Sequence, residues 1–177
     1  MLLKDYQGAI DDFDKAILIK PDAFTYFSRG VSKINLKEFS SAIEDINKGL
    51  VLSPNDYKAY DSRANARIQT GDYTGALSDY NKVLNLRPNY TIAYNNRGII
   101  KFNLKNYKDA ISDYLKAIEI DPNFENAYTN LGSAKGMEKD YIGSIEAFTK
   151  AININNKSDR AYFFRGCLLY TSDAADE

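Results

Sequence analysis

The sequence predicts an all-α fold, a solenoid in which antiparallel helix pairs stack along one axis. The first observation behind this prediction is a tyrosine that recurs every 34 residues, at Tyr26, Tyr60, Tyr94, Tyr128 and Tyr162. The second is a small residue four positions after each tyrosine, at Gly30, Ala64, Gly98, Gly132 and Gly166. A fixed period of about 20–50 residues is typical of repeat proteins, in which each unit packs mainly on its neighbours.

Each unit carries the pattern of two helices joined by a turn. In residues 91–124 the first half places apolar residues at helical spacing around Gly98. The second half carries the apolar stripe of an amphipathic helix, formed by Ala110, Ile111, Tyr114, Ala117 and Ile118. The polar residues 104–106 form the turn, and the preceding unit has Gly71 there, which suits the left-handed conformation that ends many helices. Pro122 ends the second helix, because proline cannot continue the hydrogen-bond ladder.

The small residues predict that the two helices of a unit cross closely. A glycine inside a helix costs about 1 kcal/mol relative to alanine, so its recurrence at one position indicates a steric gain. We expect Gly98 on the first helix and Ala110 on the second to bring the two helices together. Tyr94 and Tyr114 are then expected to fill the space around these two residues.

The period divides the chain into four complete units and two partial ones. We expect the second helix of a truncated unit at 1–22 and the first helix of another at 159–177, flanking complete units at 23–56, 57–90, 91–124 and 125–158. Residues 167–177 read CLLYTSDAADE, which resembles one translated frame of a sequencing adapter. We therefore expect this tail to be non-native and the chain to be a fragment. Uncapped repeats expose apolar faces, so the fragment is expected to self-associate through its ends.

The whole pattern resembles the tetratricopeptide repeat, a helix–turn–helix unit of 34 residues. Seven positions of the unit 91–124 carry the resemblance, namely Tyr94, Gly98, Tyr107, Ala110, Tyr114, Ala117 and Pro122. The pattern recurs in register up to about Gly166. The resemblance implies a right-handed superhelix whose first helices line a concave groove, and a role in binding other proteins. One departure recurs: the family commonly has leucine before the small residue, whereas this chain has Arg29, Arg63, Arg97 and Arg165.

These arginines predict an ion pair within each of three units. Arginine and aspartate stand sixteen residues apart as Arg29 and Asp45, Arg63 and Asp79, and Arg97 and Asp113. In the fourth complete unit Leu131 replaces the arginine and Ala147 replaces the aspartate, so both charges are lost together. Pairing between adjacent units is disfavoured, because Asp113 would then face Leu131. An anion-binding column of arginines is the alternative interpretation, and internal pairing is favoured over it.

Composition argues against catalysis and metal binding. The chain contains no histidine and one cysteine, which excludes histidine acid–base chemistry and a zinc site made of cysteine and histidine. The acidic residues recur at repeat positions, and we interpret them as solvated or paired charges. The sequence therefore predicts no catalytic residue, no cofactor and no metal site.

Charge and hydropathy argue against two further classes of partner. The net charge is −1, without the electrostatic footprint of a nucleic-acid-binding protein. No apolar run approaches the roughly 18 residues that a membrane span requires. The start carries no secretory signal pattern, and the compartment stays open, with the cytoplasm as the default.

The resemblance places the candidate binding surface on the first helices. We expect this groove to be lined by Phe24, Phe27, Val31, Lys58, Asp61, Asn65, Ile92, Asn95, Asn96, Ile99, Phe102, Asn126, Thr129, Asn130 and Ser133. Its N-terminal part is apolar and aromatic, which suits a partner helix or a hydrophobic side chain. The asparagines can donate to and accept from an extended peptide backbone. Two alternatives stay open: that Phe24 and Phe27 face an upstream repeat, and that the asparagines reflect composition.

The sequence thus predicts a non-catalytic scaffold that binds a protein or peptide segment in the groove. It disfavours the clamp with which some family members grip the C-terminal carboxylate of chaperones. Asp61 stands where that clamp needs a lysine, and Asn126 and Asn130 stand where it needs lysine and arginine, so a carboxylate ligand would be repelled. The alternative function is a regulatory or substrate-docking arm of a larger enzyme whose catalytic domain lies outside this sequence.

Overall fold

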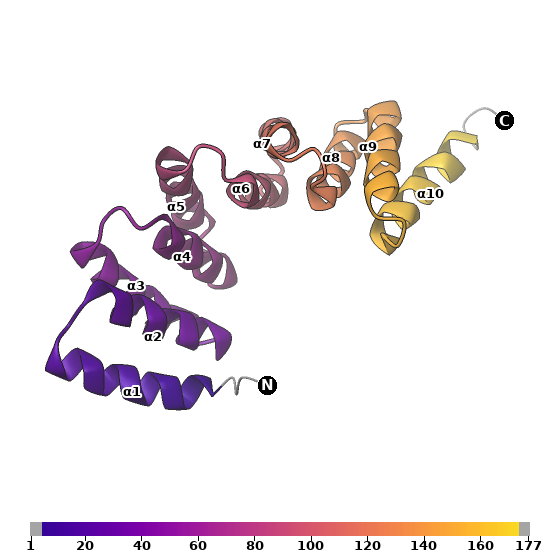
Figure 1. Ribbon diagram of the computed structural model, residues 1–177. Coiled ribbons are helices and arrows are strands. Elements are labelled where there is room, and N and C mark those ends of the chain that lie inside the picture. Colours follow the sequence, from indigo (N-terminus) through magenta and orange to yellow (C-terminus); the bar gives the residue numbers. More distant parts are fainter. Residues whose placement is uncertain (1–4, 174–177) are drawn as a thin grey trace. The chain divides into compact units, whose positions relative to one another are not determined.

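The structure is a computed structural model that describes residues 5–173, with side chains up to residue 170. Within that range every regular element is an α-helix (Figure 1). The helices are α1 (Tyr6–Ile19), α2 (Ala23–Asn35), α3 (Phe39–Leu52), α4 (Tyr57–Gln69), α5 (Tyr73–Leu86), α6 (Thr91–Asn103), α7 (Tyr107–Ile120), α8 (Glu125–Met137), α9 (Tyr141–Ile154) and α10 (Asp159–Asp173). The predicted all-α class is confirmed. Part of the expected non-native tail, 174–177, lies outside the described residues.

The helices form two compact units, divided between Pro88 and Asn89. In the first unit α2 packs on α3 and α4 packs on α5, while α1 packs on α2 and α3 packs on α4. In the second unit α6 packs on α7 and α8 packs on α9, while α7 packs on α8 and α9 packs on α10. Each unit is therefore a series of helices in which every helix contacts the next, as expected of helical repeats.

Aspartate side chains start several of the helices. The residue before the first turn accepts a hydrogen bond from a backbone N–H of that turn in five helices, at Asp5, Asp22, Asp56, Asp72 and Asp140. These N–H groups have no partner within their helix, so the carboxylates satisfy donors that would otherwise be unpaired.

The turns inside the repeats share one left-handed residue. Gly71 has φ +82°, as its predicted role requires, and three lysines occupy equivalent turns, with φ 64° at Lys37, 61° at Lys105 and 66° at Lys139. In the lysine turn of the third repeat, the N–H of Lys105 bonds the carbonyl of Phe102 at 2.9 Å and the N–H of Asn106 bonds that of Lys101 at 2.9 Å. Such bonds satisfy the last carbonyls of the helix, so lysine tolerates a conformation that glycine adopts more readily.

The core forms where a large residue of the second helix meets a small residue of the first. Tyr114 is 1% exposed, and a Cβ atom added to Gly98 would lie 2.6 Å from its ring. The predicted close helix crossing is therefore confirmed at this pair. The three atoms nearest to that Cβ all belong to Tyr114, so a part of Tyr94 in filling the same space stays a prediction. Tyr94 is half-buried, and the guanidinium of Arg97 lies 5.4 Å from the centre of its ring.

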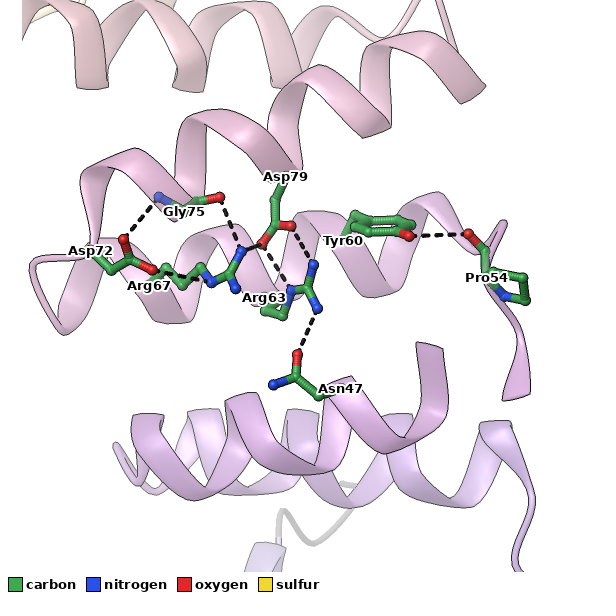
Figure 2. A network of polar contacts seen from close by, with 8 residues as sticks. All are labelled: Asn47, Pro54, Tyr60, Arg63, Arg67, Asp72, Gly75 and Asp79. Atoms are coloured by element: carbon green, nitrogen blue, oxygen red, sulfur yellow. Dashed lines mark hydrogen bonds and ion pairs between the residues drawn. The ribbon is translucent and has the colours of Figure 1, made fainter. Parts of the chain in front are cut away.

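The predicted ion pairs within repeats are confirmed in all three units (Figure 2 shows that of α4 and α5). Arg63 donates to both carboxylate oxygens of Asp79, with Nε–Oδ2 at 3.0 Å and Nη2–Oδ1 at 2.5 Å. A second cation, which was not predicted, completes each site. Arg67 bonds Asp79 at 2.7 Å, Lys33 bonds Asp45 at 2.8 Å and Lys101 bonds Asp113 at 2.8 Å. The signal was present in the sequence, because Lys33, Arg67 and Lys101 each follow a pairing arginine by four residues.

These arginines also reach the preceding helix pair. Arg63 Nη1 donates to Asn47 Oδ1 of α3 at 2.6 Å, and Arg29 Nη1 donates to Asp14 of α1 at 2.5 Å. One guanidinium therefore contacts three helices, two in its own repeat and one in the repeat before it.

The fourth repeat replaces this network with apolar contacts. Leu131 and Ala147 are buried, and both line a hollow with Leu115 of the preceding helix. Lys135, at the position of Arg67, bonds Asp140 at 3.0 Å instead. The joint loss of both charges thus leaves no stranded ion at this place among the described residues.

Candidate functional site

The first unit contains an apolar hollow of about 540 Å³ between α1, α2 and α4. Phe24 and Val31 of α2, two of the predicted groove residues, line it and are 76% and 42% exposed. Phe27 lines it as well, but its ring packs on Gly49 and on the cluster of Ile46, Leu50 and Ala59, so this residue is also part of the core. Helix α1 contributes Tyr6, Ala9 and Phe13 to the lining of the hollow.

Tyr6 and Phe13 were not predicted as groove residues, because they fall in the partial unit 1–22, which lacks a first helix. Their place in the apolar stripe of a helix was readable from the sequence. The structure brings them to the same hollow as Phe24, which remains largely exposed. That Phe24 and Phe27 face a further upstream repeat stays a prediction.

The α4 side of the hollow is polar. Lys58 is exposed and lines the hollow together with Ala59 and Ser62, and Asp56 caps the helix through its bonds to the N–H groups of Lys58 and Ala59. Asp61 follows one turn after Lys58 and is half-buried. Its burial raises the pKa of its carboxyl group above the ordinary value.

Asn65, another predicted groove residue, is held inside the first unit. Its Oδ1 accepts a hydrogen bond from the Tyr80 hydroxyl at 2.8 Å. Its Nδ2 makes a long contact of 3.5 Å with Asp61 Oδ2. The amide is therefore oriented by α5 rather than left free to rotate.

The asparagines of the second unit bond one another. Asn130 Nδ2 on α8 donates to Asn95 Oδ1 on α6 at 2.9 Å, and Asn95 Nδ2 donates to Asn96 Oδ1 at 3.3 Å. Asn95 and Asn130 are 5% and 7% exposed. These amides hold neighbouring first helices together, and a part in binding a peptide backbone stays a prediction.

The remaining predicted residues of the second unit divide between surface and interior. Ile92 is 45% exposed and Asn126 is exposed, whereas Thr129 is buried and donates to Glu125 at 2.7 Å. The other predicted residues of this unit, Ile99, Phe102 and Ser133, line a smaller hollow of about 150 Å³. It is lined by Ile99, Phe102, Asn103, Tyr114, Asn130, Ser133 and Arg160.

Clusters of metal-ligating side chains and membrane-spanning helices are two kinds of site that would bear on the function of the described residues. No three of their histidine, cysteine, aspartate and glutamate side chains gather closely enough to hold a metal ion. None of the helices in this part of the chain has the length and apolar character needed to cross a bilayer.

Comparison with known proteins identifies the repeat. Family models described as "Tetratricopeptide repeat" match residues 91–124 and 125–158, and one described as "TPR repeat" matches residues 64–105. No curated protein sequence matches the chain.

Solved structures with the same fold are numerous. The crystal structure of MamA is 25% identical, with a TM-score of 0.83 over 86% of this chain and 90% of that chain. YrrB, described as "a TPR protein with an unusual peptide-binding site", is 20% identical, with a TM-score of 0.82 over 92% and 84% of the two chains. The first TPR of Spaghetti (RPAP3), bound to the HSP90 peptide SRMEEVD, is 19% identical, with a TM-score of 0.64 over 68% and 94%.

The matched models together span residues 64–158, which is more than half of the 177 residues. The helix pairs, the small residues at their crossings and these matches agree with one another. The chain belongs to the tetratricopeptide repeat family.

Proposed function

We propose that this chain is a non-catalytic protein-interaction scaffold that binds a peptide segment or a partner helix on its first helices. The observation that carries the proposal is the apolar hollow of the first unit, where Phe24 and Val31 are exposed beside α4. Large apolar side chains that remain exposed together in a concave surface are typical of a binding site.

The relatives support the proposal by analogy of fold. YrrB is described as having a peptide-binding site, and the Spaghetti repeat is bound to a peptide. Both share the helix-pair architecture with this chain. Their sequence identities of 20% and 19% support a common fold only. The same architecture therefore serves peptide binding elsewhere, and in this chain the hollow is the surface best suited to it.

The ligand proposed here differs from a chaperone C-terminus. Asp61 adds a half-buried carboxylate on α4 between residues that line the hollow, and Asn126 and Asn130 supply no cation in the second unit. A terminal carboxylate would meet repulsion at Asp61 without compensation.

The test screens a library of short synthetic peptides against the full chain and measures dissociation constants by fluorescence anisotropy. Phe24→Ala should weaken the selected peptides about tenfold, because it removes an exposed apolar anchor of the hollow. Leu18→Ala is the matched control. Leu18 is 86% exposed on α1, and it does not line the hollow.

The control variant should bind like the unmodified chain. Absence of any bound peptide, or equal binding by the Phe24→Ala variant and the unmodified chain, would contradict the proposed site.

A further inference from the structure

Asp61 carries a carboxylate oxygen that the protein leaves without a hydrogen bond. Its Oδ1 is buried, and no donor among the described residues reaches it. Its Oδ2 has the long contact of 3.5 Å with Asn65 Nδ2. Buried polar groups in native proteins are nearly always paired, so an unpaired carboxylate oxygen calls for an explanation.

The arginines on the same helix are committed to another carboxylate. Arg63 and Arg67 both donate to Asp79 on α5. Lys58, one turn before Asp61, is exposed. Helix α4 thus gives one aspartate of α5 two cations, whereas Asp61 Oδ1 on α4 itself receives none.

Asp61 lies beside the hollow of the first unit. Lys58, Asp61 and Asn65 follow at the i, i+3, i+7 spacing that places side chains on one face of a helix. Lys58 lines the hollow, and so does Ser62, the residue after Asp61. A segment seated on Phe24 and continuing along α4 therefore meets Asp61 about one helical turn beyond Lys58.

We propose that Asp61 recognises a lysine or arginine of the bound segment, next to a bulky apolar side chain that occupies the hollow. This inference rests on the proposed function and adds the chemistry of the ligand. Charge complementarity selects the occupant: an ammonium or guanidinium group supplies the missing donor in a charge-assisted hydrogen bond. An acidic segment would instead place a second negative charge beside the unpaired Asp61 carboxylate and be repelled.

A binding role also explains why the protein retains an unfavourable group. A buried anion without a partner lowers the stability of the free protein, and such conflicts concentrate at functional sites. Asp61→Asn keeps the shape of the side chain and removes its charge. The variant should therefore melt at a higher temperature than the unmodified chain at pH 7, while it binds basic segments less well.

The experiment uses the full chain and the peptide library, with the varied positions carrying lysine, arginine, glutamine or glutamate beside one phenylalanine or leucine. The unmodified chain should prefer a basic residue at one position by about tenfold over glutamine. Asp61→Asn should lose this preference. Asp12→Asn is the matched control, since Asp12 is exposed on α1 and the substitution removes the same charge.

The outcomes separate this inference from the proposed function. Peptides that bind in a Phe24-dependent way with no preference for a basic residue would overturn the role of Asp61 and leave the scaffold function standing. Binding of no peptide would overturn both. An equal loss of preference in the Asp12→Asn and Asp61→Asn variants would show attraction by net charge and refute recognition at Asp61. A melting temperature lowered by Asp61→Asn would refute it too, as expected for a purely structural aspartate.

Discussion

Removing Asp79 alone should destabilise the protein far more than replacing Asp79 and Arg63 together. The Asp79 side chain is 2% exposed and accepts from Arg63 at 2.5 and 3.0 Å and from Arg67 at 2.7 Å. Asp79→Ala therefore leaves two guanidinium groups facing an apolar position. Breaking a buried ion pair on one side costs about 3–5 kcal/mol, because the remaining charge stays desolvated.

The expected loss lies at the lower end of that range. Arg63 retains 15% exposure and Arg67 retains 21%, so both cations keep some water. Arg67 also keeps an ion pair with Asp72, at 3.4 Å. We therefore expect Asp79→Ala to lower the free energy of unfolding by about 3 kcal/mol.

The double variant Arg63→Leu/Asp79→Ala copies two of the three residues of an arrangement that the chain already contains. The third, Asn47, is exposed, so water can replace its bond from Arg63. The fourth repeat has Leu131 and Ala147 at these two positions, with the adjacent Lys135 paired to Asp140. Since a buried ion pair is often replaced by apolar residues without loss, we expect the double variant to unfold within about 1 kcal/mol of the unmodified chain.

Urea unfolding followed by circular dichroism measures both variants, and Arg63→Leu alone is the control. In this control Asp79 keeps its bond from Arg67, so its loss should fall between those of the other two variants. A double variant as unstable as Asp79→Ala, or a single variant within about 1 kcal/mol of the unmodified chain, would refute the reasoning.

Three further predictions concern packing and charge. Tyr114→Ala should lower the free energy of unfolding by about 3–5 kcal/mol, because the ring is 1% exposed. Tyr94→Ala should lower it clearly less, because Tyr94 is half-buried. Equal losses of the two variants in urea unfolding would contradict the assigned core. Gly98→Ala should cost about 1–3 kcal/mol by overpacking, whereas Gly166→Ala, with no atom within 4 Å of its added Cβ, should raise or preserve the midpoint. The stability advantage of Asp61→Asn at pH 7 should disappear as the pH falls below 3.8. Because the pKa of Asp61 is raised in the folded protein, the unmodified chain gains stability as Asp61 takes up a proton. A stability advantage of Asp61→Asn that grows on acidification would contradict this direction of the pKa shift.

The sequence was most informative about features that repeat with the period. Arg63 and Asp79 recur and vanish together, and this joint behaviour was sufficient to predict their bond. The small residue at Gly98 likewise predicted a close helix crossing. It did not reveal which aromatic residue meets that glycine, because the unit 91–124 carries one on each helix, Tyr94 on the first and Tyr114 on the second.

Features outside the period were not predicted. The bond between Asn95 and Asn130 joins residues 35 positions apart, one more than the repeat, so alignment of the units places Asn130 opposite Asn96 instead. The division of the structure at Pro88 also has no counterpart in composition, since Pro54 and Pro122 occupy the same position in other units. The unpaired oxygen of Asp61 was not predictable either, because it depends on which side chains surround this one carboxylate. The spacing of residues along the sequence carries no information about those surroundings.

The arginine that touches three helices restricts how repeats of this chain can be rearranged. Arg63 needs a polar group such as Asn47 on the helix before it, and Arg165 finds one in Thr149, at 3.1 Å. Leu131 instead shares an apolar hollow with Leu115. The third and fourth repeats therefore form a matched pair, and a duplication or shuffling event that separated them would place a guanidinium against leucine or a leucine against an amide.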